Sequence, residues 1–189
     1  MANNYFPIHG VLPPVVTPFT PEGKVDLDAF VSNIEKWNET GVCGYLVLGS
    51  NGETPYLEEE DKLELIRLAA QHAAPGKIIM AGTGLESTQA TIRLTEKAAQ
   101  AGAEVFCVDA GWFGMPGKSW GCGLGDWEPC DGRFGPEGFQ GFVDYVRGLG
   151  MVPGFWLEID ACHEESKLYQ KPDSWFLCRQ GRRIGGGRA

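Results

Sequence analysis

The chain has 189 residues, of which 43% are hydrophobic and 22% are charged, and this is the composition of a folded globular protein. The formal net charge of −9 disfavours binding to nucleic acid or to an anionic membrane surface. No apolar run approaches the ~20 residues that span a bilayer, and the first ten residues lack the pattern of a signal peptide. We therefore expect a cytoplasmic protein that has no nucleic-acid partner and no membrane partner.

Short apolar runs alternate along the chain with segments whose apolar residues recur every three or four positions. This alternation is typical of repeated strand–helix units, so it predicts an α/β fold with a parallel sheet. Asp26 and Ser87 are expected to cap the first and third helices, and Gly102 is expected to end the third. The expected strands are 11–19, 44–48, 77–81, 105–108 and 152–159.

The fourth expected strand is followed by a long loop over 111–138 that is rich in Gly, Trp and Pro, before a helix over 139–148. Loops of this length inside a domain are usually functional. Five strands are too few for a complete eight-stranded barrel, which typically needs ~250 residues. We expect a partial barrel of about five strands that is open or completed by self-association, because an incomplete barrel leaves a strand edge unpaired.

Six cysteines are present, but no pair has C-x-x-C spacing and no export signal precedes them, so we expect reduced thiols. No metal and no cofactor are expected. The alternative is a zinc site built from soft ligands, namely Cys122, Cys130, Cys162 and His163.

Ligands of parallel α/β proteins bind at the carboxyl ends of the strands, which makes the loops there the candidate sites. Ser50, Asn51 and Gly52 offer a hydroxyl, an amide and backbone N–H groups that suit a carboxylate or phosphate. The alternative is a Gly-rich turn that binds no ligand. Asp109 and Glu158 end the fourth and fifth expected strands, either as paired carboxylates for sugar binding or acid–base work, or as a capping Asp and an ion-paired Glu.

The first part of the chain contains the motifs PPVVTPFT, GYLVLGSNGETPYL and IIMAGTGLESTQATI. Over residues 10–102 it resembles the pyruvate-dependent Schiff-base aldolases of the dihydrodipicolinate synthase and N-acetylneuraminate lyase family, most of all the 4-hydroxy-2-oxoglutarate aldolase branch. The resemblance implies that Ser50 and Asn51 hold the carboxylate of pyruvate, with Thr17 beneath the site. It also implies an imine-forming Lys and a proton-relaying Tyr, both on strands later than those expected here.

The second part contains the motifs VFCVDAGWFG, LGDWEP, FVDYVRGLGMVPGFWLEI and DSWFLCRQGRRI. Over residues 103–189 it resembles the catalytic barrel of family-36 glycoside hydrolases, the α-galactosidases. The resemblance implies that Asp109 binds substrate hydroxyls, although Ala110 stands where many members carry a second Asp. Trp112 and Trp127 would line the sugar pocket and Glu158 would lie in its wall, while the two catalytic carboxylates would follow a later strand.

The two resemblances predict a chimera with an aldolase-like part over 1–102 and a galactosidase-like part over 103–189. The main hypothesis is a scaffold that binds a small 2-oxo acid or a galactoside at most, has no complete catalytic set and self-associates. The alternatives are a working Schiff-base aldolase and a galactosidase-type fragment. Lys118, in the long loop, is the lysine that could serve as a substitute imine former.

Overall fold

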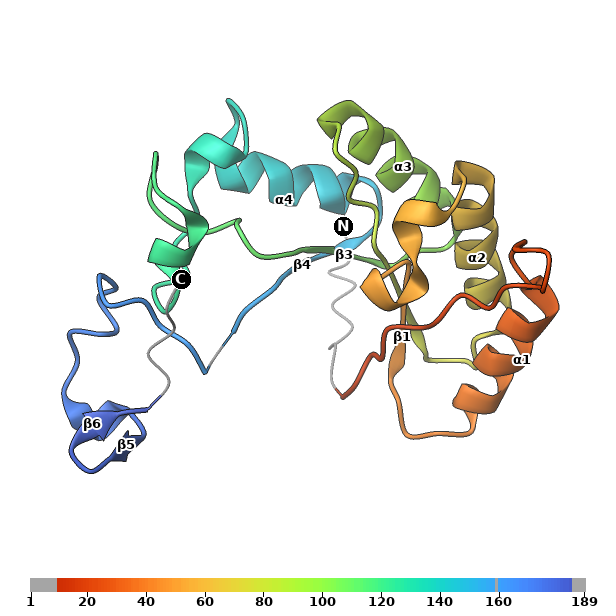
Figure 1. Cartoon of the computed structure of the whole chain (residues 1–189). Coiled ribbons are helices and arrows are strands. Elements are labelled where there is room, and N and C mark those ends of the chain that lie inside the picture. Colours follow the sequence, from red (N-terminus) through yellow and green to blue (C-terminus); the bar gives the residue numbers. More distant parts are fainter. Residues whose placement is uncertain (1–9, 159, 185–189) are drawn as a thin grey trace. The chain divides into compact units, whose positions relative to one another are not determined.

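The structure is a computed structural model that describes residues 10–158 and 160–184. The chain divides into two compact units, of which the first comprises Met1–Cys107 and Arg147–Val152. The second comprises Val108–Val146 and Pro153–Ala189. Figure 1 shows the elements in sequence colours.

The described elements alternate between strand and helix over most of the chain. The helices are α1 (Leu27–Asn38), α2 (Glu59–His72), α3 (Thr88–Ala101) and α4 (Gly138–Gly148), with short 3-10 turns between them. The strands are β1 (Gly44–Val47), β2 (Ile78–Ala81), β3 (Val105–Val108), β4 (Val152–Phe155), β5 (Cys178–Arg179) and β6 (Arg182–Arg183).

The main sheet has four strands in the order β1-β2-β3-β4, and β5 pairs with β6 in a separate sheet. β1 and β2 are parallel with Gly44 opposite Ile78, and β2 and β3 are parallel with Met80 opposite Val105. In the first unit α2 packs between α1 and α3 and contacts both β1 and β2 (Figure 1). The predicted parallel α/β class is therefore confirmed.

The predicted first strand over 11–19 is wrong as a strand. The segment follows β1 through one parallel bridge, Pro14 to Leu46, with hydrogen bonds from Val15 N–H to Leu46 O and from Leu46 N–H to Pro13 O. Three prolines in this segment, Pro13, Pro14 and Pro18, supply no N–H for a continuous ladder. Within residues 10–158 and 160–184 the main sheet consequently has four strands where the sequence pattern predicts five.

The helix ends predicted from the sequence are confirmed. The Asp26 carboxylate accepts a hydrogen bond from Ala29 N–H at 2.9 Å and begins α1. Ser87 caps α3 in the same way through Ala90 N–H, and Gly102 ends α3 in the left-handed conformation with φ 111°.

The two units have different interiors. The core of the first is mainly aliphatic, with side chains at most 1% exposed that include Ile34, Leu65, Ile66, Leu94 and Val105. The second is built around an aromatic cluster in which Trp112, Phe113 and Leu124 are buried. Partly buried rings pack on that cluster, among them Trp127, Phe139, Phe155 and Trp156. Aromatic rings thus organise the long loop that the sequence pattern left irregular.

A short hairpin, β5–β6, was missed in the sequence and lies in the segment after β4. The strands are antiparallel with Arg179 opposite Arg182, and the two residues between them, Gln180 and Gly181, both have positive φ. Two left-handed residues are the requirement of a tight two-residue hairpin turn.

Among the helices that the structure describes, none is long and apolar enough to cross a membrane.

Candidate ligand-binding loops

The loop after β1 contains the Ser50–Gly52 turn, which is a single 3-10 turn. Its first hydrogen bond runs from Gly52 N–H to Gly49 O at 2.9 Å, so the N–H groups of Ser50 and Asn51 precede the hydrogen-bonded part. Left-handed residues flank it, Leu48 with φ 61° and Glu53 with φ 53°. A non-glycine residue in the left-handed backbone conformation costs roughly 1–3 kcal/mol of folding free energy, and such conformations cluster at functional loops.

Thr17 fixes this turn from the preceding segment. Its buried hydroxyl donates to Gly52 O at 2.8 Å, which joins two parts of the chain that lie 35 residues apart. Thr54, which was not identified in the sequence, holds the other end of the turn because its hydroxyl donates to Gly49 O at 3.1 Å. Thr17 therefore contacts the turn directly, while the role in pyruvate binding that the resemblance implies for it stays a prediction.

The polar side chains of the turn face solvent. Ser50 and Asn51 are exposed and lie next to each other, with the Ser50 hydroxyl 3.4 Å from Asn51 Oδ1. A hydroxyl, an amide and two N–H groups on one turn are hydrogen-bond donors of the kind that bind a small anion such as a carboxylate.

The candidate sugar-binding residues of the second unit have distinct surroundings. Asp109 directly follows β3 and is exposed, with its Oδ1 accepting the Ala110 N–H at 2.7 Å. Glu158 is half-buried and lies beyond the end of β4. Asp109 thus lies at the end of its strand as predicted, whereas the expected strand over 152–159 ends at Phe155, so Glu158 lies in the loop beyond it.

Trp112 and Trp127 are brought together around Phe113, whose ring lies 5.4 Å and 4.7 Å from theirs. Trp112 is only 7% exposed, and its indole N–H donates to Trp156 O at 2.8 Å. The ring of Trp112 thus packs into the protein interior, whereas Trp127 stays partly exposed. Of the two indoles, Trp127 retains more surface for a ligand.

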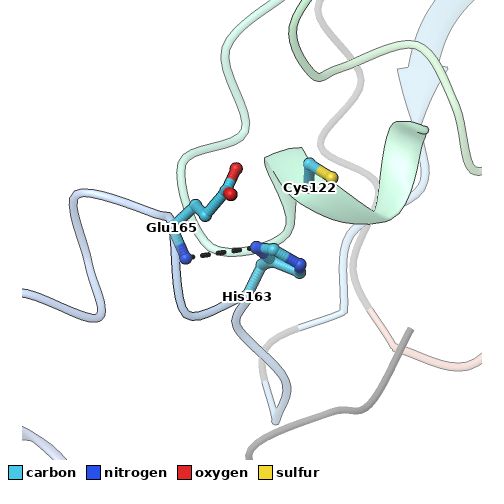
Figure 2. Close-up of side chains that lie close together, drawn as sticks. All are labelled: Cys122, His163 and Glu165. Carbon is cyan, nitrogen blue, oxygen red and sulfur yellow. Dashed lines mark hydrogen bonds between the residues drawn. The ribbon is translucent and has the colours of Figure 1, made fainter. Parts of the chain in front are cut away.

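Three possible metal ligands lie together in the second unit (Figure 2). One ligand atom each from Cys122, His163 and Glu165 lies within 4.8 Å of the other two. The zinc alternative in the sequence included Cys122 and His163 but missed Glu165. It also named Cys130 and Cys162, which are buried and are not members of this cluster.

Lys118 is bound to the same cluster. Its Nζ donates to Glu165 Oε2 at 2.6 Å, and both side chains are about half exposed. This hydrogen bond and the opposite charge raise the pKa of Lys118 above its usual value and lower that of Glu165. An ammonium held in this way has no free electron pair, so the structure gives Lys118 the role of an ion-pair partner.

A sheet of parallel strands joined by helices, with polar groups on the loops after the strands, is the architecture of the βα-barrel class. Two family models match the chain, each over more than half of its length. The chain belongs to the dihydrodipicolinate synthetase family through residues 7–109 and to the melibiase family through residues 81–189.

Curated relatives match the first part of the chain. The 4-hydroxy-tetrahydrodipicolinate synthase of Xanthomonas axonopodis pv. citri is 39% identical over 101 residues, which are 53% of this chain and 33% of the relative. That of Rhizobium meliloti is 33% identical over 107 residues, 57% of this chain and 36% of the relative. The chain therefore spans about a third of the length of these relatives.

Solved structures agree with this relation. The dihydrodipicolinate synthase of Aquifex aeolicus is 33% identical, with a TM-score of 0.52 over 58% of this chain and 37% of its own. A dihydrodipicolinate synthase of Bacillus anthracis aligns over 82% of this chain and 45% of its own, with a TM-score of 0.55 and 22% identity. The second similarity concerns the fold alone, and it extends beyond the part matched by the first family model.

Proposed function

We propose that the chain is a chimeric βα scaffold whose first part binds a small 2-oxo acid such as pyruvate. The hydrogen bond from Thr17 to Gly52 carries this proposal, because it holds the Ser50–Gly52 turn in place while Ser50 and Asn51 stay exposed. The relation to 4-hydroxy-tetrahydrodipicolinate synthases supports the substrate class. The two family matches support the chimera, with an aldolase-like part over 1–102 and a galactosidase-like part over 103–189.

The binding mode follows from the chemistry of the turn. A carboxylate has two acceptor oxygens, and charge-assisted hydrogen bonds to such oxygens are roughly twice as strong as neutral ones. The Ser50 hydroxyl, the Asn51 amide and the two N–H groups that precede the hydrogen-bonded part of the turn are the donors. Because all of them lie on one short turn, which Thr17 holds in place, they can converge on an anion without a donor from another part of the chain.

Binding is tested by titrating the purified chain with pyruvate in a calorimeter or by NMR. Replacing both Ser50 and Asn51 with Ala is expected to abolish the binding. A matched control exists in α1, where Ser32 and Asn33 form a second Ser–Asn pair that can be replaced by Ala in the same way. Binding that survives the first double variant, or is lost in the control, contradicts the proposed site.

The same proposal holds that the 189-residue polypeptide does not turn over substrate, because resemblance assigns none of its residues as the imine-forming Lys. Borohydride reduction in the presence of pyruvate tests this point, since only an imine is trapped as a covalent adduct. We expect no adduct. An adduct that disappears in a Lys118→Ala variant would instead establish the aldolase alternative with Lys118 as the amine.

A second candidate function, galactoside binding, is favoured by one observation in the second unit. Asp109 is exposed directly after β3, and Trp127 keeps part of its ring surface accessible. A carboxylate that accepts from sugar hydroxyls beside an indole face is a common arrangement for carbohydrate. Galactose titration of the chain and of its Asp109→Ala variant tests it, and binding that is unchanged in the variant contradicts the assignment.

Self-association is part of the proposal. In the segment before α1, Val11 and Val16 are 65% and 46% exposed, and this apolar surface lies next to a sheet. Exposed apolar surface and free strand edges favour pairing with a second copy. Light scattering after size-exclusion chromatography is expected to give a mass above that of one chain at high concentration. A monomeric mass over the whole concentration range would contradict this expectation.

A further inference from the structure

We propose that Cys122, His163 and Glu165 bind a divalent transition-metal ion, with zinc as the best match to their chemistry. The three donor atoms already lie within 4.8 Å of one another (Figure 2). The site belongs to the second unit and does not depend on the 2-oxo-acid site of the first.

The donors come from two loops that are tied together by hydrogen bonds. Cys122 lies in the 3-10 turn Trp120–Gly123, and the other two donors lie in the loop after β4. The His163 N–H donates to Leu124 O at 3.0 Å. Leu124 lies two residues after Cys122, so this hydrogen bond fixes the two loops against each other close to the donors. The Asp126 carboxylate adds a second tie, because it accepts the N–H groups of Lys167 and Leu168 at 2.9 and 3.1 Å.

Close backbone packing reinforces these ties. Gly125 has φ 99°, and a Cβ at this position would lie 2.7 Å from the Cβ of Cys162 and 3.2 Å from the Ser166 hydroxyl. Only glycine lets the two loops approach this closely. Cys122 and His163 are therefore positioned by the backbone of both loops, and binding sites that are held in place in advance need little reorganisation.

The donor types select the metal. A thiolate, an imidazole and a carboxylate together suit Zn²⁺, which binds each of them in proteins. Three protein ligands leave the fourth tetrahedral position for water, as in zinc sites that are not purely structural. Around a tetrahedral zinc, donor atoms lie roughly 3.3–3.6 Å apart, so side-chain rotations that close gaps of about 1 Å are sufficient.

Two groups compete with a metal for these donors. Lys118 Nζ occupies Glu165 Oε2, which leaves the second carboxylate oxygen as the metal ligand. The Glu165 N–H points at His163 Nδ1 at 3.1 Å, so this ring nitrogen carries an electron pair when the imidazole is neutral. Binding replaces the Cys122 S–H bond with an S–metal bond and releases that proton to solvent.

Because Lys118 Nζ donates to Glu165, removing the Lys118 ammonium should strengthen metal binding.

Cobalt is the probe, because a thiolate bound to Co²⁺ gives a charge-transfer absorption that shows directly whether a cysteine is a ligand. The reduced chain is titrated with Co²⁺, and zinc affinity is then measured by competition with a chromogenic chelator. We expect one ion per chain and a charge-transfer band. Cys122→Ser should abolish the band, and His163→Ala and Glu165→Gln should each weaken zinc binding at least about tenfold.

Two further variants separate a metal site from a coincidental cluster. Cys178→Ser removes an exposed thiol outside the cluster and should leave both the band and the affinity unchanged. Lys118→Gln should tighten zinc binding about twofold to fivefold, the strength of a surface ion pair. The far-UV ellipticity of each variant checks that it folds. Glu165→Gln keeps the shape of the side chain, so weaker zinc binding in this variant reports the lost carboxylate even if another variant perturbs the loops.

No charge-transfer band in the unmodified chain would overturn the proposal. A band that survives in Cys122→Ser but disappears in Cys178→Ser would also overturn it, because the metal would then be held elsewhere. Weaker zinc binding in Lys118→Gln would contradict the competition between the ammonium and the metal.

Discussion

The two units of this chain reach a buried interior by different means. In the first, three amphipathic helices cover short strands, α1 and α3 begin at side-chain N-caps, and the core is mainly aliphatic. In the second, most of the chain is loop and 3-10 turn, and indole and phenyl rings cluster around the buried Phe113. The first unit depends on regular periodicity, whereas the second depends on particular ring contacts and on hydrogen bonds between loops.

This difference predicts where single substitutions act. In a regular strand–helix unit the backbone groups hydrogen-bond to one another within the helices and the sheet. Each buried side chain then contributes only a small part of the stability of the core. In a loop-built unit a few large rings exclude water from many turns at once. Loss of one ring should therefore cost more than loss of one aliphatic side chain of equal burial.

The largest expected effect is that of Phe113→Ala in the second unit. Phe113 is fully buried, and its ring contacts those of Trp112, Trp120, Trp127 and Trp156. Removal of such a ring typically lowers the free energy of unfolding by about 3–5 kcal/mol. Urea unfolding followed by tryptophan fluorescence measures it, because five of the six tryptophans belong to the second unit.

The matched change in the first unit is Leu65→Ala, at a position in α2 that is equally buried. Its expected cost is about 2–5 kcal/mol, and it should shift the far-UV ellipticity, which α1, α2 and α3 dominate. We expect Phe113→Ala to move the fluorescence transition more than the ellipticity transition. Equal shifts would show that the two units unfold together.

The sequence predicts the first unit better than the second for a physical reason. Asp26 and Gly102 act on helix ends within one turn of chain, so local pattern is enough to identify them. The three prolines of the first segment argue against a continuous strand already in the sequence, because they supply no N–H for a ladder. Gln180-Gly181 offered only a weak turn signal, because glutamine is an unusual residue for the left-handed position that it occupies.

The candidate sites show the same division. Ser50, Asn51 and Gly52 are consecutive, so their proximity is guaranteed by the chain itself. Cys122 and Glu165 are brought together by hydrogen bonds between two loops that follow no period, so no spacing rule could pair them. The sequence therefore indicates the donor types for a metal, but only the structure shows that Glu165 joins Cys122 and His163.

A close backbone approach in the first unit gives the next largest effect. A Cβ on Gly82 would lie 2.3 Å from the backbone oxygen of Leu48, a buried residue directly after β1, so the backbone would have to shift. Gly82→Ala should therefore lower the free energy of unfolding by about 1–3 kcal/mol. Gly84→Ala is the control, since nothing lies within 4 Å of its Cβ position, and it should stay within about 0.5 kcal/mol of the parent chain. Equal thermal stability of the two variants would contradict the packing described here.

Thr17→Val tests the link between stability and the proposed ligand site. Valine keeps the shape of threonine but removes the hydroxyl that donates to Gly52 O, which leaves a buried carbonyl without that partner. We expect a loss of about 1–3 kcal/mol in unfolding free energy, together with weaker pyruvate binding because the turn is no longer held. Thr17→Ser restores the hydroxyl and should recover the binding. If the parent chain, Thr17→Val and Thr17→Ser all bind pyruvate with the same affinity, Thr17 has no role in the proposed binding site.

The smallest expected effect is that of Asp26→Ala, and its size discriminates between one and two unfolding units. Loss of the N-cap at Ala29 N–H should cost about 1 kcal/mol, and Asp26→Asn should recover most of it because asparagine caps equally well. A change of 1 kcal/mol lowers the melting temperature by about 4–8 °C when about 60–100 residues unfold together, but by only about 2–4 °C when about 150–250 do. If the first unit unfolds by itself, the shift in far-UV ellipticity should lie near the larger range while the tryptophan transition stays in place. A small shift common to both probes would instead show that the whole chain unfolds as one cooperative body, and the contrast between the two interiors would then be one of composition alone.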